Sequence, residues 1–476
     1  MSDTRTREEI GSLALAGILI AATLLRLVGL REWPFEQDEL YTLRDAIDLG
    51  ASSSGPGISA RPVYYLLQHV LLALLPPTPG WLRLPPLVFG LLGVWVTARL
   101  GARVFGRTAG IVAALLVAVS PWHIYASQFA RYWSLVYLLF AFALLALLRA
   151  LDGDRRRDWF VVAGAVGIGA VTHPTFVFPL VGALLALHLV SADGRVRWDW
   201  PSRNAFTAGW IPAVLVAAAV LVPVRLFAPA GRFSNGVGRG IGETLRVFLG
   251  MIQWSGMDVA VVACLAGAAF LLAPRDRRWG AVTLVGCATG VLLLLVSGVG
   301  NDIYADYGMA MLPLVFVTAG GVVHRLGEVA GAARLASTIG ATVLLVSSAL
   351  PGTLSHYSNG TRYDHRPSFA RIADSAEPHP VFAWPIIVAR HYAPELVLSE
   401  FAGSAAQLER ASVDGGFWVL TSVSRQGLVP DDGSARQWLD RHCRVELRTE
   451  RPRFDYRSYR VELLWCGDMP APATRS

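Results

Sequence analysis

Residues 10–41 read IGSLALAGILIAATLLRLVGLREWPFEQDELY, an apolar stretch that ends in a short acidic segment. The part from Ile10 to Leu30 is about as long as a membrane-crossing helix, which needs roughly 20 mostly apolar residues. It has no small-residue cleavage site and runs directly into the charged stretch Arg31–Glu39, so we interpret it as a retained helix and not as a signal peptide. The chain is thus predicted to begin with a membrane helix that carries an acidic segment to the membrane surface.

The apolar character continues through most of the 476 residues. Hydrophobic residues make up 54% and charged residues 16%, against roughly 25% charged residues in an average soluble domain, and the mean hydropathy is +0.46. We therefore predict an α-helical polytopic membrane protein with about eleven transmembrane helices, all within residues 1–351. After the first helix, the predicted spans lie near residues 84–104, 108–125, 131–149, 159–173, 174–191, 205–227, 258–273, 280–299, 308–325 and 333–351.

The charged residues and cysteines exclude several other classes of protein. The formal net charge of +7 comes from arginine, because the sequence has no lysine, and chemistry on a lysine amine is therefore excluded. The arginines lie between apolar runs and form no single basic face, which argues against nucleic-acid binding. Four cysteines without a CxxC pair exclude a zinc ribbon and a disulfide-based scaffold.

The arginines also predict an orientation, since short cytoplasmic connections carry an excess of Lys and Arg. With the N-terminus in the cytoplasm, alternate connections each carry two to four arginines, whereas those near 172–174 and 299–307 carry none. We expect a multi-pass protein of the plasma (inner) membrane with an extracytoplasmic C-terminus. The five arginine-rich connections are Arg99–Arg107, Arg149–Arg157, Arg195–Arg203, Arg275–Arg278 and Arg325–Arg334.

Two regions are predicted to lie outside the membrane. Residues 31–82 form a long external loop that includes an amphipathic helical piece at Pro62–Leu75. Residues 352–476 are polar and form a small extracytoplasmic α/β domain. Within it, Phe417–Thr421 and Tyr459–Trp465 are typical of strands and Gln437–His442 of part of a helix.

Two of the four cysteines belong to this C-terminal region. If the runs that begin at Cys443 and end at Cys466 pair as an antiparallel hairpin, the two thiols face each other and an oxidising compartment permits a disulfide. Two unpaired thiols are the alternative, because the sequence does not define the register of the hairpin. Cys264 and Cys287 lie in predicted spans and are expected to stay reduced.

The acidic segment Trp33–Tyr41 is the first candidate for chemistry. It places Asp38 and Glu39 just outside a membrane helix, between aromatic residues that anchor chains at the interface. A carboxylate that is partly desolvated there is suited to act as a general base. The alternative is a loop that is solvated among the lipid headgroups.

Arginines and aromatic residues follow in the external loop. Arg61 and Arg83 are candidates for gripping a phosphate, which the planar guanidinium fork matches in shape, and Tyr64, Tyr65 and His69 are expected to line the cavity beside them. Anchoring at the membrane surface by long arginine side chains is the alternative.

A third group lies between the third and fourth predicted spans. His123, Gln128, Arg131 and Tyr132 are polar at a depth where polar side chains are costly unless they face a cavity or a partner. We expect them to form the wall of an external cavity, with Arg131 as a further phosphate ligand. A satisfied corner between two helices is the alternative.

Taken together, these motifs resemble the GT-C superfamily of membrane glycosyltransferases. The most similar branch is the protein mannosyltransferase and aminoarabinose transferase group, which includes the rhizobial lipopolysaccharide glycosyltransferases. The motifs cover roughly residues 10–150, and residues 150–350 match in hydropathy alone. The shared motifs are the Asp-Glu pair after the first helix, Arg-Pro-x-Tyr-Tyr-Leu-Leu from Arg61, Leu-Arg-Leu at residues 82–84, Gly-Ala-Arg-Val-Phe-Gly-Arg at residues 101–107, and Ser-Pro-x-x-Ile-x-x-Ser-Gln-x-x-Arg from Ser120.

The resemblance implies a GT-C fold and an inverting transfer of a hexosyl or pentosyl group from a polyprenyl-phosphate sugar to an external glycan, lipid or protein. It implies Asp38 as the catalytic base, with Glu39 beside it, and Arg61 on the lipid-linked phosphate. Relatives differ in their need for a divalent cation; if one is used here, Asp38 is the expected ligand, and no other cofactor is expected.

Two positions depart from the family pattern. Several relatives have a second aspartate at the start of the fourth span, where this chain has Gln128-Phe-Ala-Arg-Tyr-Trp133. The chain therefore favours a single base with arginine support for the leaving phosphate. The Arg-Tyr pair that often precedes a late span is replaced by Ala305-Asp306-Tyr307.

Two other functions are weighed against this one. A secondary transporter would have a similar number of helices, but the sequence has no matching halves and its charges lie at helix ends. An O-antigen polymerase or ligase would place key arginines in a late external loop, and Phe227–Gly242, with Arg232 and Arg239, keeps that alternative open. The sugar, the acceptor, the prenyl chain length and the oligomeric state are not defined by the sequence.

Overall fold

A computed structural model describes the chain except for residues 1, 50–60, 192, 197–199, 228–239, 299–303, 376–377, 425–426, 430–432, 451–459 and 468–476. The chain forms two compact units. The first, which we call the helical unit, comprises Met1–Leu30 and Thr42–Leu354. The second, the C-terminal unit, comprises Ser355–Ser476 together with Arg31–Tyr41. The acidic segment therefore packs with residues that follow it by more than three hundred positions.

Each of the eleven apolar segments predicted from the sequence lies on a helix. Among the described residues, six helices are long and apolar enough to cross a membrane, or seven if the bent pair α7 and α8 is one span, and three more apolar helices are shorter. The number of eleven spans stays a prediction. The helices are α1 (Ser2–Leu27), α2 (Gln37–Asp48), α4 (Pro62–Leu72), α5 (Pro79–Leu82), α6 (Leu84–Phe105), α7 (Arg107–Val119), α8 (Pro121–Ser127), α9 (Trp133–Gly153), α10 (Arg156–Thr172), η1 (Pro174–Phe176), α11 (Val177–Leu189), η2 (Ala205–Trp210), α12 (Ile211–Phe227), α13 (Gly240–Leu272), α14 (Arg277–Gly298), η3 (Ala305–Met311), α15 (Leu312–Val329), η4 (Gly331–Ala333) and α16 (Arg334–Asn359).

Small residues let neighbouring helices of the helical unit approach closely. A Cβ atom on Gly110 of α7 would lie 2.4 Å from the carbonyl oxygen of Ala98 on α6, so only glycine fits at this contact. α7 and α8 meet at an angle of 65°, at the point where Pro121 follows Ser120. Ser120 caps the new helix by accepting a hydrogen bond from the His123 backbone N–H at 3.3 Å.

The five arginine-rich connections are linked to one another by polar contacts. Arg103 pairs with Asp152, Ser202 donates to Asp154 at 2.6 Å, and Arg277 donates to the carbonyl oxygen of Gly194 at 2.9 Å. The first contact joins Arg99–Arg107 to Arg149–Arg157, and the second joins Arg149–Arg157 to Arg195–Arg203. The third joins Gly194, which directly precedes Arg195–Arg203, to Arg275–Arg278.

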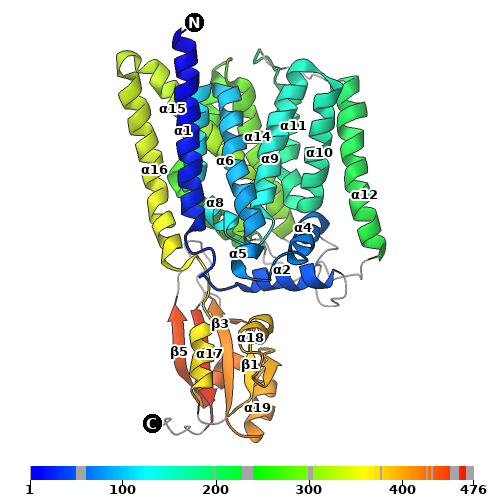
Figure 1. The fold of residues 1–476 in the computed structure, drawn as a ribbon, viewed down its shortest axis with the longest axis vertical. Helices are drawn as coiled ribbons and strands as arrows, with labels where there is room; N and C mark the ends of the chain where they lie inside the picture. The colour runs from blue at the N-terminus through cyan, green and yellow to red at the C-terminus, as the bar shows by residue number, and fades with distance from the viewer. Residues whose placement is uncertain are drawn as a thin grey trace. The chain divides into compact units, whose positions relative to one another are not determined.

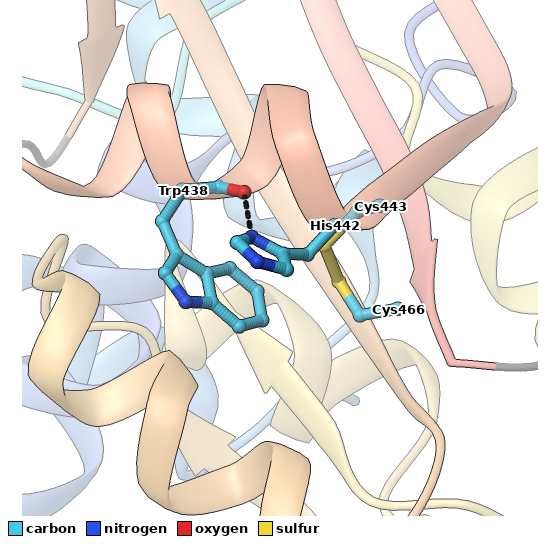
Figure 2. Close-up of a disulfide and its surroundings, with 4 residues drawn as sticks. All are labelled: Trp438, His442, Cys443 and Cys466. Atoms are coloured by element: carbon cyan, nitrogen blue, oxygen red, sulfur yellow. Dashed lines mark hydrogen bonds between the residues drawn. A yellow bond between two sulfur atoms is a disulfide. The ribbon is translucent and has the colours of Figure 1, made fainter.

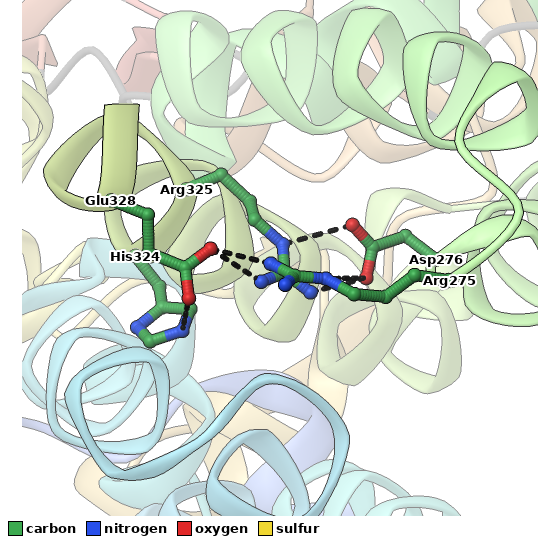
Figure 3. A network of polar contacts seen from close by, with 5 residues as sticks. All are labelled: Arg275, Asp276, His324, Arg325 and Glu328. Atoms are coloured by element: carbon green, nitrogen blue, oxygen red, sulfur yellow. Dashed lines mark hydrogen bonds and ion pairs between the residues drawn. The ribbon is translucent and has the colours of Figure 1, made fainter. Parts of the chain in front are cut away.

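The last link joins the fourth connection to the fifth. Arg325 donates to Asp276 at 2.9 Å and to Glu328 at 2.6 Å, and His324 lies 3.3 Å from Glu328. Figure 3 shows Arg325 between the two carboxylates. Burial raises the pKa of Asp276, and the adjacent Arg275 acts in the opposite direction. All five connections thus lie at one end of the helical unit, as the alternation of arginines predicted.

The C-terminal unit is built on a six-stranded sheet of order β2-β1-β3-β6-β5, with β4 paired to β3. β1 is parallel to β2 and β3, and the pairs β3–β6 and β5–β6 are antiparallel. The strand predicted at 417–421 lies in β3, the one predicted at 459–465 coincides with β6 from Arg460 on, and the helix piece predicted at 437–442 lies in α20. Figure 1 shows β1, β3 and β5 of this sheet. The elements are α17 (Arg366–Ala373), β1 (Val381–Ala383), α18 (Ile386–Tyr392), β2 (Leu398–Glu400), α19 (Ala405–Val413), β3 (Phe417–Ser424), β4 (Gly427–Val429), α20 (Ala435–His442), β5 (Cys443–Glu450) and β6 (Arg460–Cys466).

The antiparallel pairing of β5 and β6 brings the two C-terminal cysteines together. Cys443 and Cys466 are register partners and form a disulfide, which confirms the hairpin prediction over two unpaired thiols. Figure 2 shows this bond beside His442, whose ring stacks on Trp438 at 4.5 Å and lies 2.9 Å from the Trp438 carbonyl oxygen. Cys264 and Cys287 are free.

The disulfide makes a direct prediction for thiol labelling. A maleimide reagent should modify two cysteines in the denatured, unreduced protein, mapped to Cys264 and Cys287, and four after reduction. In the Cys443→Ala/Cys466→Ala variant the C-terminal unit should lose roughly 3 kcal/mol of stability, because a closed loop of about 24 residues is opened in the unfolded state. Four reactive thiols without reductant would contradict the bond.

Candidate functional site

The predicted site residues meet at one end of the helical unit, at the ends of α9, α10 and α15 that lie away from the arginine-rich connections. α9, α10 and α15 each have one end at the arginine-rich connections, through Asp152, Asp154 and Arg325. Their other ends therefore lie at the opposite end of the helical unit, where Figure 1 also shows α4, α5 and α8. Tyr132 and His173 stand at these far ends, next to α9 and α10.

Arg61, directly before α4, is the centre of the group. Its guanidinium lies 4.8 Å from the centroid of the buried Tyr132 ring, and its Nη2 is 3.2 Å from Nε2 of His173. His173 in turn stacks on Tyr132, with ring centroids 5.1 Å apart. Among the residues that the structure describes, no carboxylate pairs with Arg61, so its charge is held by neutral groups.

Arg131 lies against the same tyrosine ring. Its guanidinium lies 5.2 Å from the Tyr132 ring, and Nη1 donates to the Tyr65 hydroxyl at 3.0 Å and to Thr42 at 3.4 Å. Tyr64 completes this wall with an edge-on contact to Tyr132 at 6.0 Å. Five residues singled out in the sequence are thus brought together: Arg61, Tyr64, Tyr65, Arg131 and Tyr132.

His173 and Tyr307 belong to this group but were not predicted as site residues. Because arginine can only donate, His173 Nε2 accepts from Arg61, and Nδ1 lies 2.7 Å from Thr175 Oγ1 and 3.3 Å from the Thr175 backbone nitrogen. Tyr307 packs on His173 at 5.2 Å. The signal available in the sequence was a polar residue at a break between two apolar runs, His173 before Pro174 and Tyr307 before the span at 308–325. We call Arg61, Arg131, Tyr132 and His173 the arginine–aromatic cluster.

His123 and Gln128 contribute to a different structure. His123 Nδ1 lies 2.8 Å from Nη2 of Arg26, which is fully buried at the end of α1. Arg26 also donates to Ser127 and to the carbonyl oxygens of Val117 and Ala118, which end α7. Gln128 donates to the carbonyl oxygen of Arg26, in the last turn of α1, at 2.9 Å and to that of Val28, just after the helix, at 2.8 Å.

These contacts satisfy helix ends that would otherwise be left with unpaired carbonyl groups. They fit the corner between two helices that was the alternative for His123 and Gln128, although Nε2 of His123 is buried without a hydrogen-bond partner among the described residues. The cavity wall stays a prediction. Arg83 and His69 are likewise engaged with backbone: Arg83 is fully buried and donates to the Leu30 carbonyl at 2.9 Å, and His69 Nδ1 lies 2.7 Å from the Ala46 carbonyl. Arg232 and Arg239, the late-loop arginines, lie outside the described residues.

The two acidic candidates differ sharply in environment within the C-terminal unit. Asp38 is exposed in the first turn of α2. Glu39, the next residue, is fully buried and pairs with Arg362 at 3.4 Å. The described residues contain no group of three or more His, Cys, Asp or Glu side chains that could hold a metal ion.

Comparison with known proteins relates this arrangement to one fold. Residues 57–227 match the family model described as dolichyl-phosphate-mannose-protein mannosyltransferase. No curated protein matches the chain in sequence. Among solved structures, ArnT from Cupriavidus metallidurans in the apo state is 14% identical, with a TM-score of 0.56 over 99% of this chain and 100% of that chain.

Two further structures are similar over most of the chain. ArnT bound to undecaprenyl phosphate gives the same TM-score of 0.56 and identity of 14%, over 98% of this chain and 99% of that one. The oligosaccharyltransferase of Archaeoglobus fulgidus in the apo form is 11% identical, with a TM-score of 0.53 over 92% of this chain and 80% of that chain. These matches show that the fold is shared over most of the chain, and the family model covers residues 57–227.

The Arg26 contacts generate a stability prediction. Arg26→Met should lower the thermal unfolding midpoint of the purified protein, because buried acceptors at the end of α7 lose their donor and each such loss costs about 1–3 kcal/mol. Arg157→Met is the matched control, since the Arg157 side chain is 75% exposed. Equal midpoints for the two variants would contradict a structural role for Arg26.

Proposed function

We propose that this protein is an integral membrane glycosyltransferase that moves a sugar from a polyprenyl-phosphate donor to an extracytoplasmic glycan, lipid or protein. The observation that carries the proposal is the arginine–aromatic cluster: two guanidinium groups lie against one tyrosine, and Arg61 has only neutral partners among the described residues. The shared fold of an enzyme whose crystal structure contains undecaprenyl phosphate supports the same ligand class.

The cluster suits a leaving phosphate. In the proposed reaction an acceptor hydroxyl oxygen attacks the anomeric carbon from the face opposite the phosphate, and the bond from that carbon to the phosphate oxygen breaks. The phosphate leaves with the bonding electrons, and arginine donors stabilise the charge that develops on it. Arg61 would bind this phosphate, Arg131 would assist it, and His173 would hold Arg61 in place.

Asp38 is the proposed base that takes the proton from the acceptor hydroxyl. Its exposure in the first turn of α2 leaves it accessible to an acceptor. A divalent cation, if one is used, would add charge neutralisation at the phosphate, with Asp38 as its expected ligand.

The proposed orientation puts this chemistry outside the cell. Five arginine-rich connections at one end of the helical unit favour the cytoplasm for that end, which leaves the arginine–aromatic cluster at the outer surface. A disulfide in the C-terminal unit suits an oxidising external compartment. We therefore propose eleven spans, a cytoplasmic N-terminus and an extracytoplasmic C-terminal unit.

Mass spectrometry of lipid-linked sugars and envelope glycans, with and without the gene, tests the overall function. An accumulated polyprenyl-phosphate sugar paired with a missing sugar on an envelope component is the expected outcome and would identify both substrates. Unchanged pools of both would contradict the proposal.

Asp38→Asn should reduce sugar transfer by about 10²–10⁴-fold, which is the usual contribution of general-base catalysis. The amide cannot accept the proton, whereas the fold should be unaffected because the side chain is exposed. Asp48→Asn, an exposed change in the last residue of the same helix, is the matched control and should be near normal. The measurement is the rate of sugar transfer at saturating donor. A fully active Asp38→Asn enzyme would contradict the assignment of Asp38 as the base.

Arg61→Gln should raise the KM for the donor by roughly 10–100-fold, because a hydrogen bond to a charged group contributes about 1.5–3 kcal/mol. Arg61→Lys should recover only part, since lysine lacks the two-pronged guanidinium. His173→Phe keeps an aromatic ring but removes the acceptor for Arg61, and it should raise the same constant by a smaller factor. Steady-state kinetics with varied donor would refute the assignment if all three variants saturate like the wild type.

A further inference from the structure

The C-terminal unit holds the acidic segment through a buried ion pair. Glu39 and Arg362 are 0% and 1% exposed, and Arg362 Nε lies 3.4 Å from Glu39 Oε2. Arg362 Nη1 also donates to the Gly360 carbonyl oxygen at 2.7 Å, and the guanidinium lies 5.4 Å from the centroid of the Trp33 ring. Burying two charges costs free energy, so such a pair is weak evidence for stability and better evidence for a defined geometry.

Glu39 connects the buried ion pair with Arg362 to the start of α2. Its Oε2 atom accepts a hydrogen bond from the Glu36 backbone N–H at 3.1 Å, which is the return half of a capping box. The Glu36 carbonyl oxygen in turn accepts the N–H groups of Glu39 and Leu40 at 2.9 and 3.1 Å. Asp38 lies inside this capped first turn, so the orientation of the turn decides where its carboxylate points.

Aromatic contacts hold the same segment upstream of α2. The Phe35 backbone N–H donates to the Tyr392 hydroxyl at 2.6 Å, and the Phe35 ring, 1% exposed, packs on His391 at 5.3 Å. Trp33 packs edge-on against His356 at 5.1 Å. Gly360, with a φ of +67°, ends α16 beside Trp33, and a Cβ there would lie 2.4 Å from the indole ring.

We infer that Arg362 is a positioning residue for the proposed reaction: through Glu39 and the capped turn it fixes the direction of Asp38. Glu39 then acts by holding the turn and does not take a proton from the acceptor. This gives the C-terminal unit a part in the transfer step. The inference rests on the proposed function, because it requires Asp38 to be the base.

The test compares Arg362→Gln, Glu39→Gln and the double variant with Arg371→Gln as the matched control. Arg371 belongs to the same unit and pairs with Glu446 at 3.0 Å, without a contact to the acidic segment among the described residues. Two measurements are made on the full-length protein in nanodiscs: hydrogen exchange of the peptide covering residues 32–41, and transfer kinetics with varied donor and acceptor.

Either single variant should speed exchange in residues 32–41 and lower kcat by about 10²-fold, the cost of a misplaced catalytic group, while the donor KM stays within about twofold. The double variant should recover part of the kcat, because neither partner is left as an unpaired buried charge. Arg371→Gln should change neither measurement. Arg362→Lys serves if Arg362→Gln does not fold, and it should lie between the wild type and Arg362→Gln in both.

The outcomes separate this inference from the proposed function. If exchange and kcat are unchanged in the variants of the pair while Asp38→Asn is inactive, the base assignment stands and the positioning role is wrong. If exchange rises but transfer is unaffected and Asp38→Asn is also active, the base assignment itself fails. A change confined to the donor KM would overturn the positioning role and assign the pair to donor binding.

Discussion

Placing a guanidinium group among neutral partners is the constraint on which the rest of the helical unit depends. Arg61 is held by an imidazole nitrogen and the face of Tyr132, and neither supplies a negative charge. Removing such a group from water is costly unless its donors are satisfied and its charge is compensated. The fold meets part of this requirement with His173 and Tyr132, and an anionic ligand would complete it. The ends of α9 and α10 must therefore be fixed relative to α4, and the contacts of Arg131 with Tyr65 and Thr42 serve the same end.

A fully buried arginine, Arg26, has the opposite role. The Arg26 guanidinium hydrogen-bonds to carbonyl oxygens in the last turn of α7, to Ser127 and to His123. These contacts stabilise the bend between α7 and α8, which precedes Arg131 in the sequence. Arg362 in the C-terminal unit secures the start of α2 in a comparable way through Glu39. In both places an arginine defines the conformation of a helix end, and a candidate site residue follows nearby in the sequence.

Much of the helical architecture could be predicted from the sequence, because apolar segments of membrane length are long-range averages that single residues do not disturb. The alternation of arginine-rich connections also held, since the contacts from Arg103 to Arg325 place all five at one end. The hairpin that carries Cys443 and Cys466 could be predicted from two strand-like runs, but its register, which brings the two thiols together, could not. Arg61, Tyr65 and Arg131 could be singled out because arginine and tyrosine occurred together in recognisable motifs.

By contrast, His173 lies 112 residues after Arg61 and occurs in no motif, and Arg26 is a single charge inside a segment that reads as apolar. The pairing of Glu39 with Arg362 depends on chain segments 323 residues apart, which no local pattern encodes.

The most direct test of the account is a structure of the full-length protein with a polyprenyl phosphate bound. We expect the phosphate within hydrogen-bonding distance of both Arg61 and Arg131, about 2.7–2.9 Å from nitrogen to oxygen, with His173 still accepting from Arg61. A phosphate bound elsewhere, with Arg61 unchanged against Tyr132 and His173, would contradict the central claim that the arginine–aromatic cluster is the donor phosphate site.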